Sequence, residues 1–196
     1  MRGLSRLAGA AALALLSSAL PLKAGSESDY AGAVRDFVKA QVLPWASDPV
    51  LVDAILKQNG ETADYTSEQI DNLDKEWRAE VERPQKPEID ALLGREASRF
   101  LRARRDRLNG LATEIILMDA RGLNVAQTDA TSDLWQGDEA KFQKSFAAGA
   151  GALFVDSIEE DESTGVLQAQ VSVTITDPAS GAPIGAMTVG IDMDRL

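Results

Sequence analysis

The sequence predicts an α+β fold, in which a helical N-terminal half that includes one long helix precedes a five-stranded antiparallel sheet. Two observations lead to this prediction. Up to about residue 111, apolar residues recur at spacings of three and four, as on one face of a helix, and from residue 112 onward they mostly follow strand patterns with turn residues between the segments. Helices followed by strands are typical of α+β folds, in which the sheet buries its apolar face against the helices.

Residues 25–111 form the predicted helical region, and its first two helices have clear end signals. The first helix is expected over residues 28–43, because Pro44 cannot continue it. The second begins at Asp48, a preferred N-cap residue, followed by Pro49 in the first helical position. We expect it to end at Asn59-Gly60, where the chain can adopt a left-handed conformation.

Two more helices are predicted before residue 112. Thr66 and Gln69 have the spacing of a capping box, and the apolar residues that follow recur with helical period as far as Pro84. The long fourth helix runs from about Pro87 to Asn109-Gly110. Six arginines crowd its second half, and we interpret them as a solvated face with favourable cations near a helix C-terminus rather than as a ligand or partner site.

Residues 112–196 are predicted to form an antiparallel meander interrupted by one helix. The segment 166–176 alternates strictly between apolar and polar residues, so one face of the sheet is apolar and the other polar. The turn Asp119-Ala-Arg-Gly122 joins the first two strands. The expected elements are strands over 113–119 and 123–129, a helix over 137–146, and strands over 152–158, 166–176 and 184–193.

The composition excludes several kinds of chemistry. The chain has 196 residues, a net charge of −11, no His and no Cys. A Ser-His-Asp triad, a thiolate nucleophile and an Fe–S cluster are therefore impossible. The acidic balance disfavours nucleic acid as a partner. We expect neither an enzyme nor a cofactor, and two carboxylates acting as acid and base, as in glycosidases, are the remaining enzymatic alternative.

The first 24 residues have the features of a secretory signal peptide. Arg2 and Arg6 precede an apolar run from Ala8 to Leu20, and the small residue Ala24 follows at a cleavage position. The run is shorter than the roughly 20 apolar residues of a transmembrane helix. An uncleaved anchor is the alternative. Because an exported protein without cysteine fits a bacterial periplasm, we expect the mature chain to be periplasmic.

Three segments carry a family resemblance. Residues 118–142, 168–178 and 183–190 resemble the Cache (PDC-type, PAS-like) extracytoplasmic sensor domains, including an Asp-x-x-Gly pattern at Asp119 that leads to Thr128-Asp129. The resemblance covers residues 112–196. It implies that the loop and helix after the first strand pair fold over the polar face of the sheet and enclose a small ligand. The family therefore implies binding and not catalysis.

The resemblance also implies partners. Most Cache domains feed a kinase, chemoreceptor or cyclase, whereas this sequence stops at Leu196 as its last strand ends. We expect a stand-alone sensor domain without its own output domain, which signals through a membrane sensor kinase or chemoreceptor partner. Related domains pair through their leading helices, so a homodimer is expected. The alternative is a non-sensing periplasmic adaptor that uses the Arg-rich helix or the acidic sheet edge for protein contact.

The loop between the second strand and the inserted helix is the candidate ligand site. Trp135 can form an apolar wall and donate one N–H, and its neighbours can fix a small polar or carboxylate ligand, with Lys141 as a possible counter-charge. In the competing interpretation, Asp133 caps a turn and Trp135 belongs to the core. The predicted ligand-binding residues are Trp135, Asp133, Thr131, Ser132, Gln127, Asp129, Gln170 and Ser172.

The acidic residues near this loop also permit a calcium site. Asp129, Asp133, Asp138 and Glu139 offer the hard oxygen ligands that calcium prefers. Their spacing does not match an EF-hand loop, which needs ligands at alternate positions with Gly and Glu at fixed places. The prediction is therefore that no metal binds.

Overall fold

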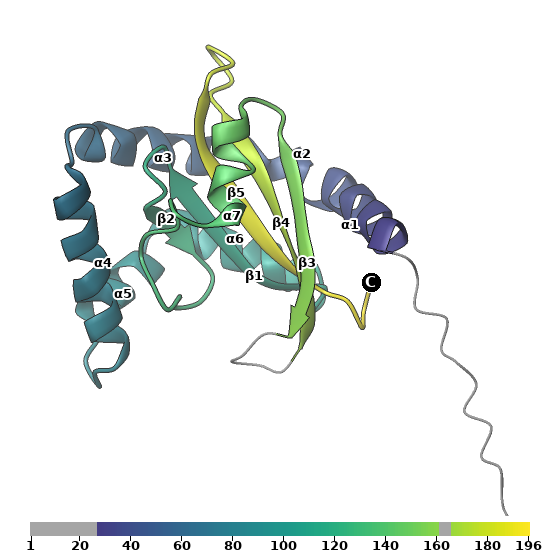
Figure 1. The fold of residues 1–196 in the computed structure, drawn as a ribbon, viewed down its shortest axis with the longest axis horizontal. Coiled ribbons are helices and arrows are strands. Elements are labelled where there is room, and N and C mark those ends of the chain that lie inside the picture. The colour runs from purple at the N-terminus through teal and green to yellow at the C-terminus, as the bar shows by residue number, and fades with distance from the viewer. Residues whose placement is uncertain (1–26, 161–165) are drawn as a thin grey trace, which may run out of the picture.

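The computed structural model describes residues 27–160 and 166–196, so the predicted signal peptide over residues 1–24 lies outside the described residues (Figure 1). Helices come first and the sheet follows. The helices before the sheet are α1 (Glu27–Gln41), α2 (Leu43–Ala46), α3 (Pro49–Thr62), α4 (Ser67–Val81), α5 (Pro87–Leu93) and α6 (Glu96–Arg107). The later elements are β1 (Ala112–Asp119), β2 (Asn124–Gln127), α7 (Ala140–Gln143), the 3₁₀ helix η1 (Phe146–Ala148), β3 (Leu153–Glu160), β4 (Leu167–Thr176) and β5 (Pro183–Asp192).

The five strands form one antiparallel sheet in the order β2-β1-β5-β4-β3. The last strand of the chain, β5, lies in the centre and pairs with both β1 and β4. This register determines which side chains share a face, because successive residues of a strand point to opposite faces. Ile115, Val189 and Val171 form a row on one face, and Ile116, Thr188 and Ser172 form the next row on the other. The predicted α+β fold class is confirmed, whereas the predicted meander is wrong, because β5 lies between β1 and β4.

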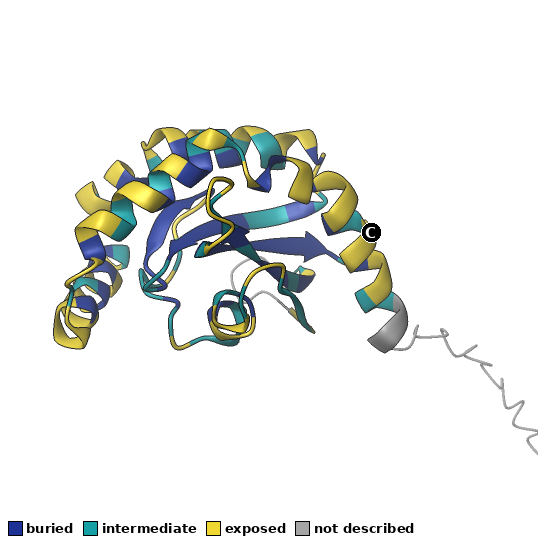
Figure 2. Ribbon diagram, turned by 90° about the horizontal axis from the view of Figure 1, so that it is seen from above, coloured by how far each residue is buried: buried dark blue, intermediate teal, exposed yellow. Residues whose placement is uncertain are grey.

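The leading helices cover only one face of this sheet. Figure 2 shows α1–α6 as an arch, with the sheet beneath it and α7 on the opposite side of the sheet. Helices α1, α3 and α6 lie directly against the strands, whereas α4 and α5 lie beyond the β2 edge (Figure 1). The other face therefore stays available to the loop between β2 and α7 and to α7 itself.

The main hydrophobic core lies between the helical arch and the sheet. Its side chains come from the apolar rows of the strands and from the inner stripes of α1, α3 and α6. Burying a side chain of this size completely stabilises the fold by about 1.5–3 kcal/mol. The fully buried examples include Val34, Val38, Leu51, Ile55, Leu101, Ile115, Leu117, Met187 and Ile191.

Several predicted helix signals are confirmed. The Asp48 side chain accepts a hydrogen bond from the backbone N–H of Val50 at 3.1 Å, as an N-cap residue does. Thr66 and Gln69 form a complete capping box, in which each side chain accepts a hydrogen bond from the other's backbone N–H. The predicted stop at Asn59-Gly60 is wrong, because α3 continues to Thr62. Buried contacts of Thr62 and the Asn59 amide with the β1–β2 turn and β5 extend the helix past its glycine.

The predicted long helix over 87–110 is also wrong. The structure has two helices there, α5 and α6, separated at Gly94 and Arg95, where Arg95 has extended backbone angles. The Ser98 hydroxyl donates to the carbonyl of Leu92 at 2.7 Å, which stabilises the break. The interruption lets Leu92 and Leu101 contact different parts of the molecule, since Leu92 packs with Trp77 of α4 and Leu101 belongs to the main core.

The helix predicted over 137–146 is shorter in the structure. Only residues 140–143 are α-helical, followed by η1, which ends at Gly149 with a positive φ of 95°. Phe142 and Phe146 stack with ring centroids 5.0 Å apart. Phe142 packs on Ile116 and Met118 from the polar side of the sheet. This small apolar cluster fixes α7 over one end of that face and leaves the other end uncovered.

Candidate functional site

The polar face of the sheet forms the floor of the candidate site. Gln170 of β4 lies opposite Gly190 of β5, and Glu114 of β1 lies on the other side of that glycine. A Cβ at position 190 would clash with Thr113 Oγ1 and Gln168 Oε1, which share a hydrogen bond of 2.6 Å, and would come within 3.1 Å of the Glu114 side chain. Glycine therefore leaves room for side-chain contacts across β5, and the Gln170 Nε2 also donates to Glu114 Oε1 at 3.2 Å.

Two walls rise from this floor and enclose a cleft of about 740 Å³. One wall is the segment of residues 128–139, which we call the cleft loop, together with the start of α7. The other wall is the outer part of β3. The cleft is open to solvent and is not the enclosed chamber that the family resemblance implied. Its lining residues are Glu114, Ile116, Ala130, Thr131, Ser132, Asp133, Gln136, Glu139, Ala140, Lys141, Asp156, Ser157, Glu159, Gln168 and Gln170.

Helix α4 fixes the cleft loop from behind. The Asp74 carboxylate accepts hydrogen bonds from the backbone N–H groups of Leu134 and Trp135 at 2.9 and 3.0 Å. Arg78, one turn later, forms an ion pair with Asp74 at 2.6 Å and with Asp133 Oδ2 at 3.1 Å. The Trp77 indole N–H donates to the carbonyl of Thr131 at 2.9 Å. These contacts all come from a single turn of α4, and together they position one wall of the cleft.

A group of buried amides lies beneath the cleft loop. Asn124 Nδ2 donates to Gln127 Oε1, to Thr131 Oγ1 and to the carbonyl of Asp133. Gln136 Nε2 donates to Asp133 Oδ1 at 2.6 Å. Within the described residues, Asn124 Oδ1, Gln127 Nε2 and Gln136 Oε1 have no hydrogen-bond partner although all three atoms are buried. A buried polar atom without a partner is costly, so these three atoms make the region beneath the cleft loop locally less stable.

The electrostatics of the cleft are dominated by carboxylates. Five acidic residues line it, and Lys141 is the one cationic side chain among the lining residues. Lys141 Nζ lies 3.0 Å from Glu139 Oε2. Burial raises the pKa of the Glu139 carboxyl above its ordinary value, and the ammonium of Lys141 opposes this by a smaller amount. The cleft therefore has an excess of hydrogen-bond acceptors and of negative charge.

Four of the eight predicted ligand-binding residues line the cleft. Thr131, Ser132 and Asp133 come from the cleft loop, and Gln170 comes from β4. Ser132 is exposed, whereas Asp133 is held by Arg78 and by Gln136. The structure thus brings together a loop and a strand that are far apart in the sequence.

The other four predicted residues lie outside the cleft lining. Trp135 forms a bridge with Leu123, and its indole N–H donates to the carbonyl of Arg121 at 2.8 Å. Gln127 is fully buried in the amide group beneath the loop. Asp129 forms an ion pair with Arg105 of α6. Ser172 is buried and shares a hydrogen bond of 2.8 Å with Thr188.

Other residues of the site were not predicted from the sequence. Glu114, Gln136 and Glu159 line the cleft, and Asp74 and Trp77 position the cleft loop. The one available signal was in α4, where an acid, a tryptophan and an arginine follow one another within a single helical turn. Nothing in the sequence indicates that this turn contacts a loop 54 to 61 residues later.

The arginines before and within α6 mainly form contacts inside the molecule. Arg95 donates to Gln58 Oε1 at 2.9 Å and to the carbonyl of Val125 at 3.0 Å. Arg102 donates to the carbonyl of Leu93, and the Arg104 guanidinium lies over the ring of Phe100. With the ion pair between Arg105 and Asp129, these contacts connect the helical half to the sheet. The expected free cationic face is therefore partly wrong.

A second groove, of about 390 Å³, lies on the helical side of the β1–β2 hairpin. Tyr65, Trp77 and Leu92 contribute apolar surface to it, and Arg95 and Glu61 lie among its polar residues. It is smaller than the cleft, and two of its lining residues, Arg95 and Gln58, share a hydrogen bond of 2.9 Å. Among residues 27–160 and 166–196, no group of three or more acidic side chains is arranged to hold a metal ion.

No family model and no curated protein matches the chain. Several solved structures are similar to it. The sensor domain of the histidine kinase DctB from V. cholerae is 16% identical, with a TM-score of 0.46, and the match covers 85% of this chain and 51% of that one. The sensory domain of the Campylobacter jejuni chemoreceptor Tlp3 is 14% identical, with a TM-score of 0.42, and the match covers 84% and 64%.

Both of these structures are sensor domains of bacterial signalling proteins. The chain spans about half to just under two thirds of their length. In the described part of the chain, no helix has the length and apolar character needed to cross a membrane.

Proposed function

We propose that this protein is a periplasmic sensor domain that binds a small polar molecule in the cleft on the polar face of its sheet. The observation that carries the proposal is the cleft itself, about 740 Å³ in volume and lined mainly by polar side chains from a loop and three strands. Its volume lies within the range of small-molecule sites, about 300–1,000 Å³. Gln136, which borders the cleft, also has a buried Oε1 without a hydrogen-bond partner among the described residues.

The proposed ligand contacts are the residues of the prediction that line the cleft. Thr131 and Ser132 offer hydroxyl groups from the cleft loop, and Gln170 offers its amide from the floor. Asp133 orients the loop through Arg78 and Gln136 as well as facing the cleft. We assign the remaining four, Trp135, Gln127, Asp129 and Ser172, to positioning the loop and the floor, because their polar atoms are bound within the protein.

The route by which occupancy would reach a partner starts at α4. A ligand that contacts Asp133 also changes the charge around Arg78, which is paired to Asp74 of the same helix. Because α4 lies at the β2 edge of the molecule, a shift of the cleft loop would be transmitted to an exposed helix (Figure 1). We propose that a membrane sensor kinase or chemoreceptor reads this change, and that two copies pair through their leading helices.

The test is a thermal-stability screen of the purified protein against amines, amino acids, carboxylates and sugars. A ligand present at one hundred times its dissociation constant adds about 2.7 kcal/mol of stability. We expect at least one class to raise the melting temperature. In a Ser132→Trp variant, the new side chain occupies the cleft and the increase should disappear, because Ser132 is an exposed lining residue.

The matched control is Ser47→Trp, which adds the same side chain at an exposed residue outside the cleft lining. It should respond to the ligand as the unmodified protein does. A flat response across the whole screen would contradict the proposal and favour the non-sensing adaptor. An increase that survives in the Ser132→Trp variant would place the ligand elsewhere.

A further inference from the structure

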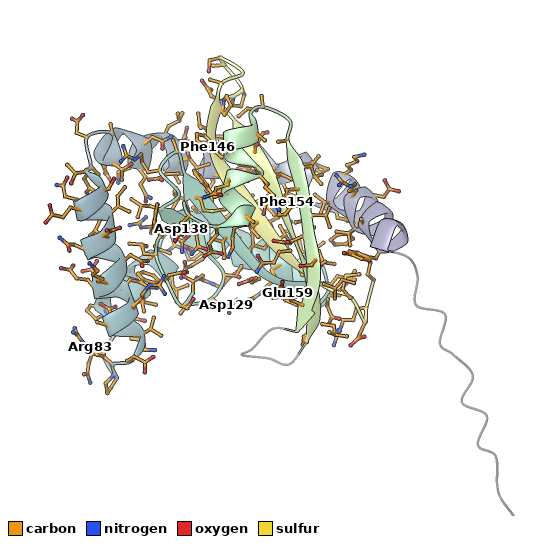
Figure 3. The ribbon with its side chains drawn as sticks, in the orientation of Figure 1. Arg83, Asp129, Asp138, Phe146, Phe154 and Glu159 are labelled. Carbon is orange, nitrogen blue, oxygen red and sulfur yellow. The ribbon has the colours of Figure 1, made fainter. Side chains whose placement is uncertain are left out.

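The cleft carries far more negative than positive charge, and the excess is concentrated on the β3 side. Asp156 and Glu159 both face the cleft from β3, and Figure 3 shows Glu159 on that strand, with Asp129 and Asp138 on the cleft loop. In the described ranges, no Lys or Arg forms an ion pair with Asp156 or Glu159. The acids on the loop side differ, since Asp133 has Arg78 and Glu139 has Lys141.

Three nitrogen donors at the cleft already have partners. Lys141 is paired with Glu139, Gln170 Nε2 donates to Glu114, and Gln136 Nε2 donates to Asp133. In contrast, one hydrogen-bond acceptor at the cleft has no partner within the described part of the chain. Gln136 is fully buried and borders the cleft, yet its Oε1 accepts no hydrogen bond from the described residues. The carboxylates would attract a cationic N–H donor, whereas an anion would meet more acceptors and like charge.

The arrangement of the acids favours an organic cation over a metal ion. A calcium site needs six to eight oxygen ligands around one point, and among the described residues no three acidic side chains converge in that way. The end of the cleft near α7 is instead partly apolar, with Ile116 and Ala140 in its lining. Such a cleft fits a molecule with a charged end and an apolar body.

We propose that the ligand of the cleft is an organic primary amine, with its ammonium group beside Asp156 and Glu159 and its carbon skeleton directed toward Ile116. This inference rests on the proposed sensor function and specifies its ligand class. The overall net charge of −11 would further raise the local concentration of cations around the protein.

Binding is measured by isothermal titration calorimetry on the purified protein with butylamine and phenethylamine, and with butyrate and phenylacetate as anions of similar size and shape. We expect heat of binding with the amines and none with the anions. Asp156→Asn combined with Glu159→Gln should weaken amine binding about fivefold or more, because two charges near the ammonium group are lost. The matched control, Asp71→Asn with Glu82→Gln, removes two exposed charges outside the cleft and should change the affinity less than about twofold.

The remaining outcomes distinguish a failure of the proposed ligand class from a failure of the proposed sensor function. If the anions bind and the amines do not, the ligand class is wrong while a small-molecule sensor remains. If both variant pairs weaken amine binding equally, the attraction is general and not due to the cleft, so the inference fails. If none of these compounds binds and the wider screen is flat, the sensor function fails as well.

Discussion

Removing the Asp74 carboxylate should release the cleft loop from α4. Asp74 is nearly buried and accepts hydrogen bonds from the backbone N–H groups of Leu134 and Trp135 at 2.9 and 3.0 Å. In Asp74→Ala both N–H groups lose their partner, at a cost of about 1–3 kcal/mol for each group that water cannot reach. The ion pair with Arg78 adds little, because half of the Arg78 side chain is exposed. We therefore expect a loss of about 2–4 kcal/mol of stability.

Urea unfolding at neutral pH measures this loss, and amide hydrogen exchange at Leu134 and Trp135 locates it. Asp74→Asn keeps a carbonyl acceptor, so it should lose less, about 1–2 kcal/mol. Asp71→Ala is the matched control, because Asp71 is exposed on the same helix and should change stability by no more than about 0.5 kcal/mol. Equal losses in Asp74→Ala and Asp71→Ala, with unchanged exchange at the two amides, would refute the reasoning.

Three further changes test the neighbouring contacts. Gly137→Ala should cost about 1–3 kcal/mol in urea unfolding, because its Cβ would lie 2.4 Å from Trp135 Nε1, and a stability equal to that of the unmodified protein would disprove this contact. Thr66→Ala should lower the melting temperature through loss of about 1 kcal/mol, and Ser67→Ala, beside it, should have a smaller effect. Because the pKa of Glu139 is raised in the fold, the folded state binds more protons than the unfolded state above pH 4.5, and stability falls as the pH rises through the raised value. Between pH 4.5 and about pH 7, the unfolding free energy of the unmodified protein should therefore fall relative to that of the Glu139→Gln variant. Parallel curves of unfolding free energy against pH for the two proteins would contradict this.

The sequence was sufficient for the order of the elements and the faces of the sheet, since both depend on local periodicity. The strict alternation in residues 166–176 became β4, with Val171 and Val173 in the core and Gln170 and Ser172 on the other face. The predicted helix ends were less accurate where tertiary contacts compete with the local conformational preference of the residues. Gly60 lies inside α3 because Asn59 and Thr62 bind the sheet, and Gly94 interrupts the predicted long helix because α5 packs on α4.

The sequence predicted the loop part of the site and one strand residue, Gln170. Hydroxyl and carboxylate groups in a polar loop after a hairpin were sufficient to identify Thr131, Ser132 and Asp133. The role of Trp135 depends on the bridge to Leu123, and periodicity does not reveal a contact of this kind. Asp156 and Glu159 line the cleft because β3 is an edge strand of the sheet. The order of the strands in the sheet differs from their order in the sequence, so the sequence did not predict this position.

The claim that the cleft is the ligand site is tested most directly by nuclear magnetic resonance of isotopically labelled protein. The compound that stabilises the protein most in the screen is titrated in, and backbone chemical shifts are followed. The account predicts that the largest changes occur at Thr131, Ser132, Asp133 and Gln170, with weaker changes reaching Asp74 on α4. Changes confined to the groove around Tyr65 and Arg95, or no changes at all, would contradict it.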